Sequence, residues 1–164
     1  MPSEPPTLSE RLSQALRGVR RARRMRAQDV ADAMGLPLRS YEYFEGGHGQ
    51  INLERIYAFA KATGSDGDAI VAAVLVGEPQ LAVWAADNKL VLALKIALGE
   101  FAEDLGADIA RIDTRTLLTA FTQMFKDLAA EAKASKAWTE ARLGGAPPEP
   151  PSTNESDPDS DPQP

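Results

Sequence analysis

Three residues, Gly35-Leu36-Pro37, separate two short segments in which apolar residues recur at helical spacing. Glycine readily adopts the left-handed conformation that ends a helix, and proline has a φ angle suited to the start of the next one. The sequence therefore predicts a helix over residues 27–34 and another over residues 38–45. A turn this short packs the two helices steeply and leaves the start of the second helix free to project.

Helical periodicity continues on both sides of this pair, and no stretch alternates apolar and polar residues in the way that a strand does. In the first expected helix, for example, Leu8, Leu12, Leu16 and Val19 lie along one face. The same reasoning predicts an all-α chain. Its expected helices cover residues 7–24, 27–34, 38–45, 52–63, 66–76, 80–105 and 114–138.

Changes in composition divide the chain into four regions. Both ends are rich in proline and carry no apolar stripe, so burial of apolar surface cannot offset the entropy that ordering them would cost. Two helical regions lie between these ends. We therefore expect a disordered leader at residues 1–6, a five-helix domain at 7–77, a second helical region at 80–143 and a disordered acidic tail at 144–164.

The net charge of −6 is distributed unevenly along the chain. Residues 1–64 hold ten Lys or Arg and seven Asp or Glu, whereas residues 65–143 hold eight and twelve. The tail holds five acidic residues and no basic one. Six arginines fall close together in the first region: Arg17, Arg20, Arg21, Arg23, Arg24 and Arg26. Because electrostatic attraction in salt acts over roughly 8 Å, a phosphate group would meet this local excess rather than the total charge.

Several classes of function are not expected from this composition. The chain has no cysteine and a single histidine, His48, so we expect no disulfide, no metal site and no cofactor. No nucleophile–base pair and no glycine-rich phosphate loop is recognisable, so we do not expect an enzyme or a catalytic residue. No run of about 18 apolar residues predicts a membrane span, and the first residues lack the pattern of a secretion signal. The expected location is therefore the cytoplasm.

The segment from residue 27 to residue 64 carries a recognisable pattern of small, apolar and turn residues. The pattern consists of Val30-Ala31, Gly35, Leu36, Tyr41, Phe44-Glu45-Gly46-Gly47, Asn52-Leu-Glu-Arg-Ile and Ala60-Lys-Ala-Thr-Gly. It resembles the Xre/Cro/C1-type, or phage-repressor-like, helix-turn-helix family. The resemblance covers residues 8–76, which is under half of the chain. It implies a five-helix repressor-like domain in a bacterial or phage transcription regulator, located at the nucleoid when DNA is bound.

The resemblance also implies which residues face double-stranded DNA. Residues 38–45 would be the recognition helix in the major groove. The positions that face base edges are Leu38, Arg39 and Tyr43. Among them, Arg39 has the chemistry to pair bidentately with guanine. The positions near the sugar-phosphate backbone are Arg26, Gln28, Ser40, Gly46, Gly47 and His48.

Two further positions have a structural role in the family, and one position departs from the family pattern. Arg20 and Glu45 match a pair that forms an ion pair between the first and third helices. Tyr41 is expected in the core rather than at DNA. The family usually opens its second helix with Ser-Gln, whose glutamine touches DNA, whereas this chain has Arg26-Ala27 there. That contact is therefore expected either to be lost or to come from Arg26 or Gln28 instead.

The second helical region suggests a protein partner. One recognition helix reads only a few base pairs, so regulators of this kind commonly dimerise on two half-sites. Residues 80–143 carry more apolar area than two helices can bury between themselves, which favours a homodimer through these helices. A compact appendage packed on the first domain and a ligand pocket are the alternatives, although no convergent polar set marks a pocket.

Two further alternatives concern function. The chain could be an antitoxin-like module whose C-terminal helices bind a partner protein while its first domain autoregulates. The acidic tail is expected to keep the chain in solution. Alternatively, it contacts RNA polymerase or another regulatory protein, or competes with DNA for the arginines.

Overall fold

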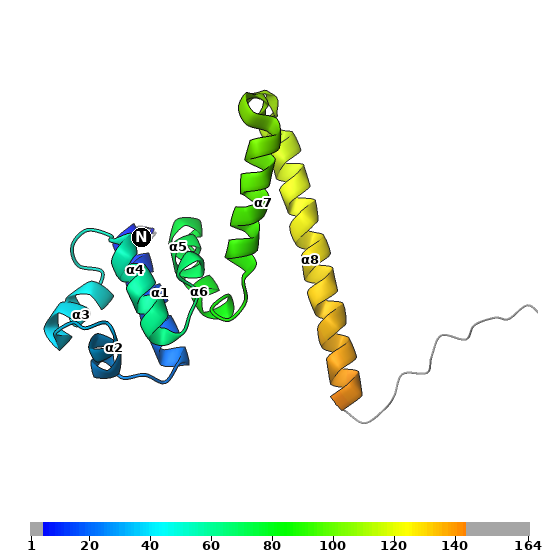
Figure 1. Ribbon diagram of the computed structural model, residues 1–164. Helices are drawn as coiled ribbons and strands as arrows, with labels where there is room; N and C mark the ends of the chain where they lie inside the picture. Colours follow the sequence, from blue (N-terminus) through cyan, green and yellow to red (C-terminus); the bar gives the residue numbers. More distant parts are fainter. Residues whose placement is uncertain (1–4, 144–164) are drawn as a thin grey trace, which may run out of the picture. The chain divides into compact units, whose positions relative to one another are not determined.

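The computed structural model describes residues 5–143, with side chains for residues 5–140 (Figure 1). In this part of the chain every regular element is helical, which confirms the all-α expectation. The elements are α1 (Leu8–Ala22), α2 (Ala27–Ala33), α3 (Leu38–Glu45), α4 (Leu53–Thr63), α5 (Gly67–Val76), α6 (Leu81–Trp84), α7 (Leu90–Leu105), a 3₁₀ helix η1 (Gly106–Arg111) and α8 (Thr114–Leu143). Most of the expected leader and the whole expected tail lie outside the described residues.

The ends of the first helices are set by capping residues. Thr7 and Glu10 form a reciprocal capping box at α1, in which the Thr7 hydroxyl accepts from the Glu10 amide at 3.2 Å and the Glu10 carboxylate accepts from the Thr7 amide at 2.8 Å. Asp66 caps the start of α5 with its carboxylate. Gly64 and Gly77 end α4 and α5 at φ angles of 61° and 82°, which other residues adopt only with strain.

Helices α1 to α6 enclose one apolar core. Tyr41 and Phe59 are its largest fully buried side chains, and neither has any exposed surface. The remaining large side chains that are fully buried are Leu16, Val19, Val30, Ile56 and Ile70. Burial of this surface is the main force that holds α2 and α3 against the other helices.

The prediction of one continuous helix over residues 80–105 is wrong. The helix breaks after Trp84 and begins again at Leu90. The cause is the polar run Asp87-Asn88-Lys89, in which the Asn88 side chain accepts a hydrogen bond from the Leu90 amide at 3.0 Å and so stabilises a turn before the new helix. Apolar periodicity did not reveal this break, because the apolar residues on either side of it still fit a helical repeat.

Residues 77–80, where the sequence predicts a boundary between domains, lie within the first compact unit of the structure. Ala82 of α6 is fully buried in the core, and Leu81 and Val83 pack against it. The first compact unit of the structure therefore includes α6 and α7 and extends to Gly106, and the second unit begins at Ala107.

Smaller differences occur at two helix ends. Helix α1 ends at Ala22, two residues before the expected end, because Arg24 adopts a φ angle of 55° that a helix cannot contain. Helix α8 continues to Leu143, beyond the expected end at residue 138.

The second compact unit contains η1 and α8. Asp113 precedes α8, and its side chain caps the helix by accepting a hydrogen bond from the Thr116 amide at 3.0 Å. Along α8, several large apolar side chains are at least one-third exposed: Leu118, Phe121, Met124, Phe125, Leu128 and Trp138. Among the described residues, no helix is long and apolar enough to cross a membrane.

Candidate nucleic-acid interface

The turn between α2 and α3 has the geometry that its three residues predict. Gly35 has a φ angle of 66°, and the Leu36 amide donates to the Ala31 carbonyl at 2.9 Å, which closes the end of α2. Pro37 has a φ angle of −58° and stands at the N-cap of α3. Leu36 packs against the core from inside the turn. The turn is therefore anchored by backbone hydrogen bonds on one side and by apolar contact on the other.

Helix α3 has one buried and one exposed face. Tyr41 and Phe44 are buried, and the Phe44 ring lies 6.4 Å from the ring of Phe59 in α4. Arg39 and Tyr43 lie on the exposed face, and the Tyr43 side chain is 56% exposed. These two residues are four positions apart, which is one helical turn, so they project from the same side of α3.

The three residues expected to face base edges are therefore not equivalent. Among the described residues, Arg39 has no hydrogen-bond or ion-pair partner and is free to meet a ligand. Leu38 is only partly exposed and packs against the core, so part of its apolar surface is already used. Tyr43 is exposed, but its ring centroid lies 5.2 Å from that of His48 at an interplanar angle of 39°. A neighbouring ring thus supports Tyr43, whereas Arg39 has no such support.

The expected ion pair between α1 and α3 is present and joins a larger network. The Arg20 guanidinium donates to both carboxylate oxygens of Glu45, from Nε at 2.5 Å and from Nη2 at 3.1 Å. The Tyr41 hydroxyl donates to the same carboxylate at 2.7 Å, and Arg20 also donates to the Met25 carbonyl at 3.2 Å. Glu45 is buried, so each of these donors helps to compensate the loss of its hydration.

The network shifts the titration of two of its members. The hydrogen bond to Glu45 raises the pKa of Arg20 further above its usual value. Burial raises the pKa of the Tyr41 hydroxyl, and the hydrogen bond to Glu45 raises it further. Both groups therefore keep their protons at any physiological pH. The protonation of Arg20 and Tyr41 thus does not change in this range, and both keep donating to Glu45 at the end of α3.

Two of the residues expected at the DNA backbone are bound to nearby carboxylates. Arg26 forms an ion pair with Asp29 at 2.8 Å, and this contact lowers the pKa of Asp29 to about 2. The Gln28 amide donates to Asp32 at 2.7 Å. Arg26, Gln28 and Asp29 lie at the start of α2, and Asp32 lies one turn further along the same helix. Either side chain must exchange its carboxylate for a phosphate before it can contact DNA.

Sequence reasoning missed these two carboxylates. The signal was available, because a partner three or four residues further along a helix lies on the same face as the residue it pairs with.

The remaining residues that were expected near the DNA backbone, in and beside the loop after α3, have different surroundings. Gly47 has a φ angle of 73°, and a Cβ atom there would lie 2.3 Å from the Ser9 carbonyl oxygen of α1. Its role is therefore close packing against α1, which sequence reasoning did not reveal. Gly46 lies against the His48 imidazole, and His48 itself is exposed. Ser40 is exposed on α3.

The arginines of the first region divide into two groups. Three have partners within the chain: Arg20 with Glu45, Arg23 with Asp87 and Arg26 with Asp29. Three others are exposed and have no ion-pair partner among the described residues: Arg17, Arg21 and Arg24. Local positive charge on this unit therefore comes from these three arginines together with Arg39, Arg55 and Lys61, which are likewise exposed and have no ion-pair partner among the described residues.

The described residues contain no group of three or more His, Asp or Glu side chains that could hold a metal ion. No family model, no characterised protein and no solved structure matches this chain. The helix-turn-helix resemblance therefore rests on the motif residues themselves, and the assignment of α3 to DNA is a proposal.

Proposed function

We propose that this chain binds specific sites on double-stranded DNA and regulates transcription, with α3 in the major groove. The observation that supports this most is the state of Arg39: it is exposed on the first turn of α3 and has no partner among the described residues. The opposite face of α3 is fixed by Tyr41, Phe44 and the Arg20–Glu45 pair. A rigid helix with a free arginine at its start suits direct reading of a base edge.

The proposed chemistry differs among the exposed residues of α3. Arg39 would donate to O6 and N7 of a guanine, and one such bidentate pair gives about 1–3 kcal/mol of discrimination against the wrong base. Tyr43, one turn later, would contact a base edge or a phosphate. Glu42 lies beside them on the exposed side and either accepts from cytosine N4 or repels phosphate.

Contacts with the sugar-phosphate backbone would come from cations that have no partner in the chain. The exposed candidates on the first unit are Arg17, Arg21, Arg24, Arg55 and Lys61. Each phosphate that such a side chain neutralises releases counterions, so binding should weaken steeply as salt rises.

We also propose that the chain binds DNA as a homodimer. None of the residues of α7 is buried, and large apolar side chains of α7 are about half exposed, with Ile96 at 55% and Leu98 at 57%. Helix α8 likewise exposes apolar residues. A helix with exposed apolar residues on most of its surface is stable only when other chains or helices cover it. A second copy would supply that cover and a second recognition helix.

The DNA proposal is tested by selection from a random double-stranded DNA library with the full chain. The intact protein should enrich one short motif. Arg39→Ala should lose preference at one guanine of that motif and bind it about 10-fold or more weakly. Arg115→Ala in α8, which also removes an exposed arginine, is the matched control and should keep the motif. Failure of the intact chain to enrich any motif would refute the proposed function.

The exposed apolar residues of α7 and α8 also favour a second candidate, an antitoxin-like module that binds a different protein. The two candidates differ in what covers these helices. Sedimentation of the purified full chain should show a dimer under the first candidate. A monomer that forms a stoichiometric complex with a second small protein encoded beside it would favour the other.

A further inference from the structure

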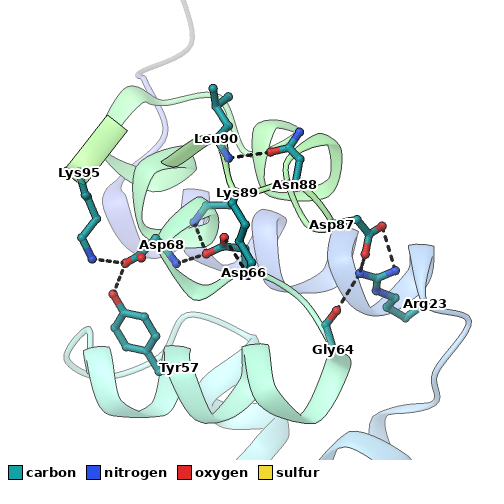
Figure 2. A network of polar contacts seen from close by, with 11 residues as sticks. Arg23, Tyr57, Gly64, Asp66, Asp68, Asp87, Asn88, Lys89, Leu90 and Lys95 are labelled. Carbon is teal, nitrogen blue, oxygen red and sulfur yellow. Dashed lines mark hydrogen bonds and ion pairs between the residues drawn. The ribbon is translucent and has the colours of Figure 1, made fainter. Parts of the chain in front are cut away.

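The segment between α6 and α7 is held in place and does not act as a free linker. Ala85 and Ala86 are buried, and they join the end of α6 to the polar run at residues 87–89. Two regions of the first unit contact this run and the first turns of α7 (Figure 2). They are the end of α1 and the junction between α4 and α5.

The first of these contacts involves Arg23 at the C-cap of α1. Its guanidinium donates to both carboxylate oxygens of Asp87, one of them at 3.2 Å, and also to the Gly64 carbonyl at 2.9 Å. One side chain thus joins three parts of the chain: the end of α1, the end of α4 and the segment before α7. The planar guanidinium fixes the direction as well as the distance of Asp87.

The second set of contacts involves the start of α5. Asp66 is 6% exposed, and its carboxylate lies 3.6 Å from the Lys89 ammonium group. Asp68 accepts hydrogen bonds from the Lys95 ammonium group at 2.9 Å and from the Tyr57 hydroxyl of α4. Figure 2 shows Asp68 between Tyr57 and Lys95, and Asp66 beside Lys89. Lys89 and Lys95 are six residues apart, so α7 is held at its N-cap and again more than one turn later.

These contacts restrain α7 from several directions. Three ion pairs join the segment before and within α7 to the first helices. They are Asp87 with Arg23, Lys89 with Asp66 and Lys95 with Asp68. With only one such contact, α7 could rotate about that contact. Three ion pairs at separate places on the segment 87–95 restrain the direction in which α7 leaves the core.

We propose that these residues fix the direction of α7 and thereby the separation of the two DNA half-sites that a homodimer reads. We call the set Arg23, Tyr57, Asp66, Asp68, Asp87, Lys89 and Lys95 the connector clamp. The inference rests on the proposed function, because it needs a dimer joined through the C-terminal helices and two recognition helices. A flexible linker in place of the clamp would let each recognition helix find its half-site over a range of separations.

The test uses the full chain and the same DNA selection, with the separation between half-sites as the readout. The variant Lys89→Met/Lys95→Met removes two clamp cations that are 69% and 57% exposed, so the core keeps its packing. The matched control, Lys126→Met/Lys133→Met, removes the same charge from exposed positions of α8 that have no ion-pair partner among the described residues. Asp87→Asn is an independent second variant, because it weakens the Arg23 contact instead.

The expected result is a change in spacing without a change in half-site. The intact chain and the control should bind the selected site at least ~10-fold more tightly than a site with two base pairs inserted, since the insertion turns one half-site by about 70° around the DNA axis. Both clamp variants should select the same half-site but lose most of this preference, to less than ~3-fold. Sedimentation and thermal unfolding should show that all four proteins are folded dimers.

Other outcomes are equally decisive. Clamp variants that keep the spacing preference of the intact chain would overturn the inference and leave the proposed function standing. An intact chain that enriches only single half-sites would overturn both the inference and the proposed homodimer, but not the proposed binding of α3 to DNA. Variants that select a different half-site would also overturn it, because the clamp would then act on α3 itself. An intact chain that enriches no motif would remove the proposed function and the inference together.

Discussion

The guanidinium of Arg20 and the carboxylate of Glu45 form two hydrogen bonds, at 2.5 and 3.1 Å, that join α1 to the last residue of α3. Glu45 is almost completely buried, and its third donor is the hydroxyl of Tyr41 in the preceding turn. The position of α3 therefore depends on an ion pair whose carboxylate, that of Glu45, stays shielded from water while the core is intact.

Removal of Glu45 should be costly. In Glu45→Ala, Arg20 and the buried Tyr41 hydroxyl both lose their acceptor, and we expect the free energy of unfolding to fall by about 2–4 kcal/mol. Glu45→Gln, which keeps an acceptor for Tyr41, should cost less. Urea unfolding of both variants and of Arg20→Ala/Glu45→Ala measures this. A loss below about 1 kcal/mol in Glu45→Ala would mean that the pair adds little.

Sequence reasoning located the first five helices to within about two residues, because their ends carry strong local signals. Thr7, Asn52 and Asp66 have side chains that cap a helix, and Gly64 adopts the left-handed conformation at no steric cost. The Arg20–Glu45 pair was predicted from the family resemblance rather than from the local sequence. These features depend on residues a few positions apart or on a shared motif.

Contacts between distant parts of the chain were not predictable in this way. The Arg23–Asp87 pair joins residues 64 positions apart, and nothing in the periodicity of either helix indicates it. The close approach of Gly47 to Ser9 similarly depends on how α3 meets α1. Such features follow from the packing of the whole unit, so they become visible only in three dimensions.

Substitution of Gly47 should be more harmful than substitution of a glycine with a similar backbone conformation elsewhere. A Cβ atom at Gly47 would lie 2.3 Å from a backbone oxygen of α1, and the φ angle of 73° adds strain. We expect Gly47→Ala to destabilise the protein by about 3 kcal/mol or more. Gly64→Ala, at a φ angle of 61° with no atom within 4 Å of the added Cβ, should cost only about 1 kcal/mol. Equal losses in thermal unfolding would argue against the close contact.

The stability of the first unit should depend on the ionisation of Asp68. Hydrogen bonds from Tyr57 and then from Lys95 hold the pKa of Asp68 below its ordinary value of 3.8. Asp68 therefore stabilises the fold above that pH, and this contribution is lost as the pH falls through the lowered pKa. We expect Tyr57→Phe to raise the pKa of Asp68 toward 3.8, as measured by NMR titration of the carboxyl carbon. Tyr43→Phe is the control, and an unchanged pKa in Tyr57→Phe would contradict the contact.

Release of Arg26 from Asp29 should strengthen DNA binding if the proposed function is correct. Asp29→Asn weakens the ion pair and removes a negative charge from the start of α2. We expect tighter binding at low salt and a plot of log K against log salt that is steeper by about one unit, because one more cation is free to neutralise a phosphate. Asp127→Asn in α8 provides the same charge change far from α2 in the sequence. Identical slopes for both variants would show that Arg26 does not reach phosphate.

Charged residues on the apolar surface of α7 should dissociate the proposed homodimer. Leu94 and Leu98 are 42% and 57% exposed and lie one turn apart on the same helical face. We expect Leu94→Glu/Leu98→Glu to be monomeric in sedimentation experiments at concentrations where the intact chain is a dimer, since a carboxylate cannot be buried in an apolar interface without a partner. Leu75→Glu, at a 69% exposed position of α5, should leave the dimer intact. The monomeric variant should still recognise one half-site, because α3 and its supporting core are unchanged, but with the affinity of a single recognition helix. A dimer that persists in Leu94→Glu/Leu98→Glu would mean that this face of α7 is not the one that a second copy covers.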